Sequence, residues 1–489
     1  MRRIAYLFLA AISLLGSATS PANGATRPHY GGTLRVMLQS APDALDITAN
    51  ATPADYWDTA RVLSLIGDTL VRLDAQGRPQ PALAVVWRSD ATARHWQFTL
   101  RRGVKFHDGS AASPAAVAQI LGALHSGWNV RASADSVSID GETAMPSLLA
   151  ELALPRNLLL KRNNNDNRVP IGTGPFLVAE WQPGKLLKLA ANEESWAGRP
   201  FVDAVEIEFG KSLRDQAIAL ELDKTDVIEA APQPASGSQR HSASSSSLSL
   251  PVELLALVFS ANSKAQDPRL REALALAIDR KPIQSVLLKG AGEPAASILP
   301  NWMTGYSAVF SAQANPQRAR SVLAGSRQST LNLSYGLSVV LSYDPRDPQA
   351  QLIAERIALN ARDVGITVQV SLSGAEDIRL MRAVLPSPDP ATSLDEAARQ
   401  LGLPQPVFSA PRGKSLDLDL DLDLDDLYQA ERSLLDGYAV IPLFHLPVAR
   451  AASTRVRNWA ADRLGEWSEA GSSLADVWLT DARPEAGSR

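Results

Sequence analysis

Hydrophobic and polar residues follow two different periods along the chain, and these periods predict where strands and helices lie. Residues 31–38 begin with two glycines and continue as an alternating pattern, which is typical of a turn followed by a strand. Apolar residues recur at helical spacing from 54 to 70, and a strand that ends in a polar turn is expected over 71–79. Apolar and polar residues alternate strictly over 96–101, which places Trp96 and Phe98 on one face of a strand.

Capping and turn residues mark further elements. Asp108 and Gly109 predict a tight turn, which we favour over a metal or catalytic role for this region and its neighbour His107. Ser113 followed by a proline predicts a capped helix that runs to about Leu124. Buried helices are expected over residues 273–280 and through 427–434, so the alternation of strands and helices indicates an α/β or α+β pattern.

Three polar stretches interrupt this pattern. The serine-rich residues 236–249 and the asparagine-rich residues 163–167 are typical of surface loops or linkers. Leucine and aspartate alternate from Leu416 to Asp425, which leaves open an edge strand, a calcium-binding repeat or a solvated acidic lead-in to the following helix. No glycine lies inside the repeat to bend it around an ion, so the acidic lead-in is favoured.

The first 25 residues predict a cleavable signal peptide. Arg2 and Arg3 precede an apolar run from Ile4 to Leu15, and small residues follow, with cleavage after Gly24 or Ala25 favoured over earlier alanines. The run is too short for a permanent membrane span, and no later segment offers the roughly 20 apolar residues that spanning needs. A soluble, exported mature protein is therefore expected.

Composition narrows the class of protein. The 489 residues favour two or three domains, and 45% hydrophobic with 20% charged residues is typical of a globular chain. The formal net charge of −4 argues against a nucleic-acid partner. The absence of cysteine excludes disulfides and a lipoprotein anchor, which favours a soluble periplasmic protein.

Four separated stretches carry a resemblance to a known family. They are Gly31–Val36 with 70–74 and 81–87, Trp96–Gly109, Gly172–Phe176 with Trp181 and 194–196, and Asp267–Arg280. In order and spacing they resemble bacterial extracellular solute-binding protein family 5, the dipeptide-, oligopeptide- and nickel-binding periplasmic proteins of ABC importers. The resemblance continues to Ile441–Phe444.

This resemblance implies an α/β, two-lobed, periplasmic-binding-protein-like fold (type II, cluster C) with an extra subdomain inserted in lobe I. The expected division is a signal peptide over 1–25, lobe I over 26–46, 171–250 and 447–489, the inserted subdomain over 47–170, and lobe II over 251–446. The chain would cross into lobe II along a strand over 254–259.

The resemblance also implies a function: capture of a peptide or peptide-like solute between the lobes, hinge closure, and delivery to an ABC importer permease with its ATPase subunits. The protein is expected to act as a monomer without a cofactor or metal. A degenerate receptor that acts as a ligand sensor or importer-independent carrier is the alternative. The chain contains no Gly-x-Ser-x-Gly, His-Glu-x-x-His or phosphate-loop motif, so an enzyme is not expected.

Six residues are the candidates for ligand binding that the resemblance suggests. They are Tyr56, Trp57, Asn262, Trp302, Asp389 and His445. In peptide-binding members an aspartate of lobe II pairs with the ligand ammonium; the nearest match here is Asp389, without the family's tryptophan, and its alternative role is a helix cap. Core packing is the alternative for the aromatic residues, and a structural role is the alternative for His445.

Overall fold

The structure is a computed structural model that describes residues 28–47, 53–74, 76–162, 168–231, 244–261, 263, 265–306, 309–327, 338–347, 349–372, 376–408, 424–459 and 474–480. The expected signal peptide, the asparagine-rich stretch and the Leu416–Asp423 part of the repeat lie outside these residues. Within the described residues, no helix is both long and apolar enough to cross a membrane.

A single eleven-stranded sheet runs through most of the molecule in the order β10-β11-β12-β1-β13-β19-β14-β18-β16-β17, with β15 paired to β19. Its strands are β1 (Thr33–Met37), β10 (Phe176–Gln182), β11 (Leu186–Ala191), β12 (Ala204–Glu208), β13 (Val227–Ala230), β14 (Ser244–Phe259), β15 (Glu293–Pro294), β16 (Ser338–Tyr343), β17 (Thr367–Ser371), β18 (Ile378–Val384) and β19 (Val440–Ser453). We call the part around β1 and β10–β13 lobe I, and the part around β16–β18 lobe II.

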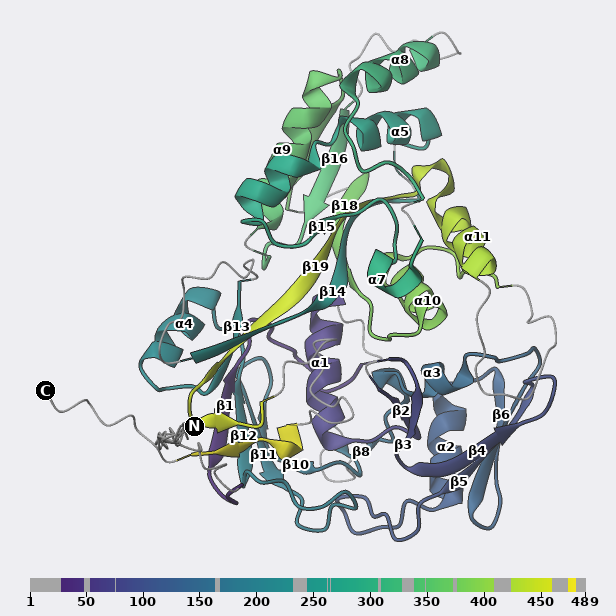
Figure 1. Cartoon of the computed structure of the whole chain (residues 1–489), viewed down its shortest axis with the longest axis vertical. Helices are drawn as coiled ribbons and strands as arrows, with labels where there is room; N and C mark the ends of the chain where they lie inside the picture. Colours follow the sequence, from purple (N-terminus) through teal and green to yellow (C-terminus); the bar gives the residue numbers. More distant parts are fainter. Residues whose placement is uncertain are drawn as a thin grey trace, which may run out of the picture.

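Two long antiparallel strands, β14 and β19, join the lobes diagonally across the molecule (Figure 1). The first half of β14 and the last half of β19 lie in lobe I, where residues 449–452 pair with β13. The second half of β14 pairs with β18 in lobe II. The prediction of a loop over 236–249 was wrong for Ser244–Ser249, because pairing with β19 gives these serines a sheet partner whatever their local preference.

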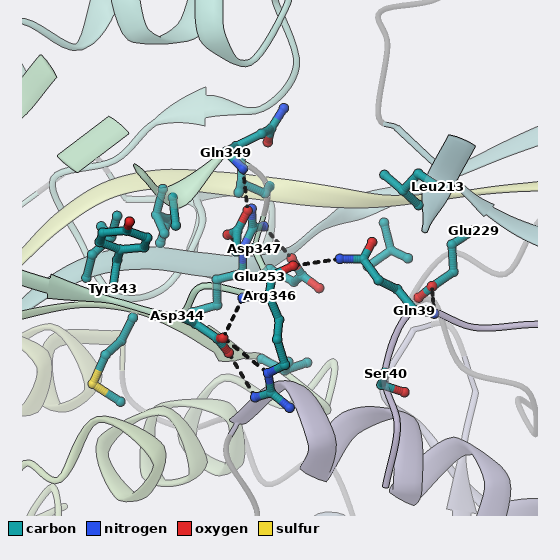
Figure 2. Close-up of a pocket in the computed structure, with 18 of the residues that line it drawn as sticks. Gln39, Ser40, Leu213, Glu229, Glu253, Tyr343, Asp344, Arg346, Asp347 and Gln349 are labelled. Carbon is teal, nitrogen blue, oxygen red and sulfur yellow. Dashed lines mark hydrogen bonds and ion pairs between the residues drawn. The ribbon is translucent and has the colours of Figure 1, made fainter. Parts of the chain in front are cut away.

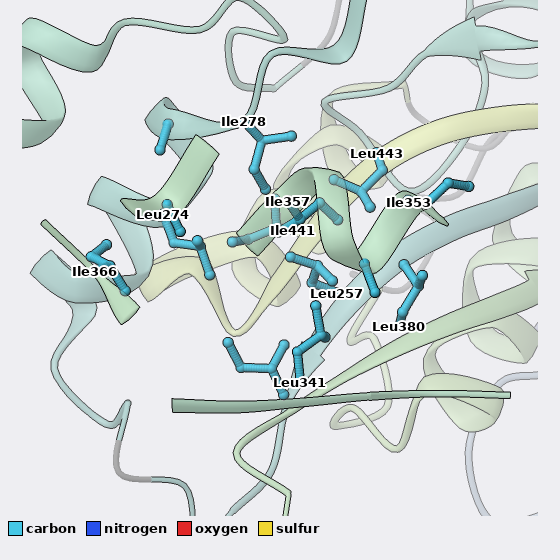
Figure 3. Packing of buried hydrophobic residues seen from close by; sticks show 14 of the residues in the cluster. Leu257, Leu274, Ile278, Leu341, Ile353, Ile357, Ile366, Leu380, Ile441 and Leu443 are labelled. Carbon is cyan, nitrogen blue, oxygen red and sulfur yellow. The ribbon is translucent and has the colours of Figure 1, made fainter. Parts of the chain in front are cut away.

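Helices cover both faces of the lobe II sheet. They are α5 (Pro268–Ala277), α6 (Arg280–Pro282), the π-helical turn η2 (Ile283–Leu287), α7 (Asn301–Thr304), α8 (Pro316–Arg327), α9 (Ala350–Asp363), α10 (Pro390–Leu401) and α11 (Leu424–Leu435), followed by the 3₁₀ turn η3 (Asp436–Tyr438). One core lies between the sheet, α5 and α9 (Figure 3), and a second lies beneath α10 and α11. The predicted helix over 273–280 ends early, at Ala277, because Ile278 is extended and Asp279 caps the next turn.

Lobe I is built from chain segments far apart in the sequence. Helix α1 (Pro53–Ile66) and the lobe I strands share one core with the C-terminal pieces η4 (Leu474–Asp476), β20 (Val456–Arg457) and β21 (Trp478–Leu479), while α4 (Leu213–Glu221) packs beside β13. Gly174 passes so close to the end of α1 that an added Cβ would lie 2.7 Å from the carbonyl carbon of Ile66. A side chain there would push the two segments apart.

A separate small sheet forms the inserted subdomain, in the order β4 (Ala84–Ser89), β5 (His95–Leu100), β7 (Ser136–Gly141) and β6 (Trp128–Ala132). Figure 1 shows it beside α2 (Pro114–Leu124) and α3 (Leu148–Leu152), on the side of the molecule away from β13. The predicted strand over 96–101 is confirmed, since Trp96 and Phe98 are fully buried in this core. The Ser113 cap is also confirmed, because its side chain accepts a hydrogen bond from the Ala116 amide.

Short elements connect these units. They are β2 (Val71–Leu73), β3 (Pro79–Pro81), the 3₁₀ turn η1 (Pro155–Asn157), β8 (Lys161–Arg162) and β9 (Pro170–Ile171). The turn predicted at Asp108 is present: its carboxylate accepts hydrogen bonds from the Ser110 amide and hydroxyl, and Gly109 has a φ of +81°.

Candidate functional site

A cavity of about 620 Å³ lies between lobe I and lobe II, beside the crossover strands (Figure 2). Lobe I contributes the loop after β1, part of α1 and the end of β13, and lobe II contributes the loop after β16 and one face of β18. Strands β1 and β16 are both parallel to their lobe neighbours, and the carboxyl ends of both open into this cavity. Clefts at the carboxyl ends of parallel strands are the usual place for ligands in α/β proteins.

Arg382 on β18 organises the lobe II wall. Its guanidinium forms ion pairs with Asp347 (2.8 Å) and Glu253 (3.0 Å), so it ties the loop after β16 to the crossover strand β14. Burial alone would lower the pKa of Arg382, but the charges of the two carboxylates outweigh it and raise this pKa. The charge of Arg382 is therefore already balanced within this wall.

Two carboxylates define the lobe I wall. Asp58 on α1 accepts a hydrogen bond from Arg61 at 2.9 Å. Glu229 on β13 accepts one from the Gln39 amide at 2.6 Å and a longer one from Gln216 at 3.3 Å. Burial, followed by the negative charge of Asp58, raises the pKa of Glu229 to about 7.

A direct hydrogen bond joins the two lobes at this cavity. The side-chain amide of Gln39 in lobe I donates to the carbonyl oxygen of Arg346 in lobe II at 2.8 Å, as Figure 2 shows. The amide and guanidinium of Arg346 are in turn held by Asp344. The loops after β1 and β16 therefore meet across the cleft.

A second contact joins the inserted subdomain to lobe II. Arg156 in η1 pairs with Glu151 of α3 and reaches across to Glu396 of α10, with Asp395 at 3.8 Å. Tyr56 on α1 belongs to the same region: burial first, and the charge of Glu396 second, raise its pKa. Its buried hydroxyl has no hydrogen-bond partner within the described part of the chain.

The other predicted site residues are dispersed over the structure. Trp57 lies on α1 with its side chain outside the described residues, and Asn262 is outside them altogether. The Trp302 indole donates to the carbonyl of Pro251 at 2.9 Å. None of the six residues is among the described residues that line the cavity, so their ligand roles stay predictions.

Asp389 and His445 both have structural partners. One oxygen of Asp389 caps α10, accepting hydrogen bonds from the Thr392 amide (2.8 Å) and hydroxyl (2.6 Å). His445 is buried in β19, with its Nε2 3.0 Å from the carbonyl oxygen of Ile298, and burial lowers its pKa to about 4. The described residues contain no group of three histidines, aspartates or glutamates placed to hold a metal ion.

Sequence reasoning missed the residues that line the cavity. A signal was present, because Glu229, Glu253 and Arg382 are charged residues with apolar neighbours on both sides in their strands. Charged residues are rarely buried unless they are paired or functional. What the sequence pattern did not contain is which of these strands face each other across the cleft.

A two-lobed α/β chain with a cavity between its lobes defines a periplasmic-binding-protein-like fold. Solved structures share it: AppA from Bacillus subtilis in complex with a nonapeptide (TM-score 0.76, 17% identity) covers 93% of this chain and all of its own. NikA from Staphylococcus aureus in complex with Ni(L-His)₂ gives a TM-score of 0.75 at 17% identity, over 92% of this chain and all of its own.

Sequence comparison gives the family. The family described as "Bacterial extracellular solute-binding proteins, family 5 Middle" matches residues 78–383, more than half of the chain. The nickel-binding periplasmic protein of Escherichia coli (strain K12) is 26% identical over 351 residues, covering 64% of this chain and 66% of its own. The probable di/tripeptide-binding protein 5 of Pseudomonas aeruginosa (strain UCBPP-PA14) is 25% identical over 362 residues, covering 63% and 66%. The matched region spans just under two thirds of these relatives, and the chain belongs to this family of solute-binding proteins.

Proposed function

We propose that this protein captures a peptide or peptide-like solute between its lobes and delivers it to an ABC importer. The partners are the importer's membrane permease and its ATPase subunits, and the protein acts as a monomer. It is exported by its N-terminal signal peptide and works as a soluble periplasmic receptor rather than a lipoprotein. Relatives that are named as di/tripeptide-, oligopeptide- and nickel-binding proteins support this class of function.

The observation that carries the proposal is the cavity of about 620 Å³ with walls from both lobes. A site whose halves belong to separate lobes is completed only when the lobes approach, and the Gln39–Arg346 hydrogen bond supplies a contact that this approach forms. Binding and closure are therefore one event, which is what a receptor needs to present a loaded state to a transporter.

The proposed division of the chain follows the same logic. Lobe I comprises 26–46, 171–250 and 447–489, the inserted subdomain 47–170, and lobe II 251–446. The three separate hydrophobic cores of lobe I, the inserted subdomain and the α5–α9 face of lobe II support this division, except that α1 (Pro53–Ile66), which the division gives to the inserted subdomain, packs in the core of lobe I. The crossover strands β14 and β19 then supply the hinge.

Mass spectrometry of solute released from natively purified protein tests the proposal, together with uptake of that solute by cells lacking the gene and complemented with variants. Ala230→Trp fills the cavity wall and is expected to abolish both copurification and uptake. Ala115→Trp, on the exposed face of α2, is the matched control and should preserve both.

The outcomes separate the alternatives. A solute that copurifies but is taken up equally well without the gene would contradict the importer role and favour the sensor or carrier. A copurified solute whose retention is insensitive to Ala230→Trp would show that the cavity is not the binding site. We propose no catalytic step, and recovery of an altered solute after incubation would contradict that.

A further inference from the structure

The cavity is lined by more carboxylates than arginines. Four arginines face it, and each is already ion-paired: Arg61 with Asp58 (2.9 Å), Arg346 with Asp344 (2.9 Å), Arg379 with Glu376 (3.3 Å), and Arg382 with Asp347 and Glu253. Each of these guanidiniums therefore already lies beside at least one carboxylate of the cavity wall. Carboxylates outnumber arginines in the lining, so the net charge of the cavity favours a cationic group over an anionic one.

Glu229 is the sixth carboxylate of the cavity and the one that these arginines do not pair. It forms no ion pair with any described residue, and the hydrogen bonds that described residues donate to its carboxylate come from neutral amides. Burial and the negative charge of Asp58 raise its pKa to about 7 even though the charges of Arg61 and Arg450 act in the opposite direction, so ionisation of this carboxylate is costly. A positive group brought into the cavity would remove the penalty.

Two neighbouring groups on the same wall are also incompletely satisfied. Asp58 is only 7% exposed and lines the cavity, and only its Oδ1 is bonded by a described residue. The buried hydroxyl of Ser40, which also lines the cavity, has no hydrogen-bond partner among the described residues. Buried polar groups are nearly always bonded in a completed structure, so these atoms point to a missing partner.

We propose that Ser40, Asp58 and Glu229 form a cation subsite on the lobe I wall, which holds an ammonium or guanidinium group of the captured solute. This inference rests on the proposed function and adds the chemistry of the solute. Two carboxylates and a hydroxyl supply acceptors for the several N–H donors of either group. The apolar remainder of the cavity, including Leu255, Met381 and Val448, suits the uncharged part of the solute.

The subsite also connects to closure. Glu229 holds the amide of Gln39, and the side chain of Gln39 reaches Arg346 of lobe II. A bound cation stabilises the ionised form of Glu229, and an ionised acceptor strengthens the hydrogen bond to the Gln39 amide. Occupation of the lobe I wall thereby favours the interlobe contact.

Four tripeptides separate the possible sources of the cation. Ala-Lys-Ala carries both an α-ammonium and a side-chain ammonium, N-acetyl-Ala-Lys-Ala only the second, Ala-norleucine-Ala only the first, and N-acetyl-Ala-norleucine-Ala neither. Calorimetry at pH 7 is expected to show that the peptide without an ammonium binds at least about tenfold more weakly than the better of the two peptides with one ammonium. This is the loss of affinity expected when a buried charged hydrogen bond is removed.

Variants assign the effect to the wall. Glu229→Gln keeps an acceptor for Gln39 and is expected to abolish the advantage of the charged peptide, as is Asp58→Asn. Glu221→Gln, an exposed carboxylate on α4 of the same lobe, is the matched control and should leave the affinities unchanged. Calorimetry in buffers of different ionisation enthalpy should detect proton release on binding near pH 7 by the wild type, and none by Glu229→Gln.

Equal affinities of the four peptides, or an unchanged preference in a folded Glu229→Gln, would overturn the subsite and leave the receptor function standing. If none of the peptides binds, the solute that copurifies decides: one with no ammonium or guanidinium group overturns the subsite. If no solute copurifies and none of the peptides binds, the proposed function fails with it.

Discussion

At the scale of single residues, variants of Asp389 distinguish a helix-capping role from a ligand-binding role. Its Oδ2 caps α10, so Asp389→Ala is expected to lower the free energy of unfolding by about 1 kcal/mol. Asp389→Ser keeps a capping oxygen but removes the charge, so its stability should stay near that of the wild type. Urea denaturation of both variants measures this difference.

The same pair of variants tests the ligand role that the family resemblance suggests for Asp389. If that role holds, Asp389→Ser should bind an ammonium-bearing solute more weakly while its stability is preserved. An affinity equal to that of the wild type would make Asp389 a cap alone.

His445 gives a pH dependence with a defined sign. Burial lowers its pKa from 6.5 to about 4, so below pH 6.5 the unfolded chain takes up a proton that the folded protein refuses. Stability should therefore fall as the pH drops from 6.5 towards 4, by an amount on the order of a few kcal/mol. Thermal denaturation across this range is expected to show a shallower fall for His445→Gln. Parallel profiles would mean that His445 titrates normally in the folded protein.

Some features of the structure could be predicted from the local sequence, and the cavity wall could not. The buried aromatic face of β5 and the cap of α2 followed from local rules, because period and capping depend on neighbours in the chain. The cavity wall did not, since Ser40, Asp58 and Glu229 come from three separate elements and become a site only through tertiary packing. For Asp58 and Glu229, a charge on a buried helix face or inside an apolar strand was the available signal.

At the scale of elements, the junction between η1 and α10 depends on one guanidinium. Arg156 neutralises Glu396, which is 3% exposed, so Arg156→Met would leave a buried carboxylate whose remaining ion-pair partner among the described residues is Arg399. The expected cost is about 3 kcal/mol in urea denaturation. Adding Glu396→Gln should recover part of this loss, because the stranded charge disappears.

Arg199 provides the comparison for Arg156. It pairs with Glu193 and Asp203, which are both exposed, so Arg199→Met is expected to cost less than about 1 kcal/mol. A similar loss in the two variants would show that the η1–α10 junction is no more than a surface ion pair.

Strand β14 shows why element boundaries escaped the sequence. Its first residues are a run of serines, and this composition favours a loop. Yet Ser244–Ser247 pair residue by residue with strand β19. The partner lies just over two hundred positions away, so no local pattern records it. In contrast, the helix over 427–434 was predicted well, because its buried face repeats within the helix itself.

At the scale of the whole molecule, Gln39 is expected to influence how far the lobes stay apart. Gln39→Ala removes the hydrogen bond to Arg346 without changing the wall charges. Small-angle scattering should show a larger radius of gyration for the ligand-free variant than for the wild type, and compaction of the wild type with its solute. Gln182→Ala, on the exposed end of β10, is the control. Identical scattering of the wild type with and without solute, and of the ligand-free wild type and Gln39→Ala, would contradict closure.

The long return of β19 to lobe I has a consequence for how the molecule assembles. β13 is bordered by β1 on one side, but its other neighbour is the segment 449–452, from the far end of the chain. Synthesis proceeds from the N-terminus, so this edge of β13 stays unpaired until nearly all of the chain has been made. Strands β16, β17 and β18 can pair with one another before then. In pulse-labelling hydrogen exchange, β13 amides should gain protection after those of β16. The wall bearing Glu229 would then be the last part of the protein to mature, and an unpaired strand edge would need shielding from other chains until it does.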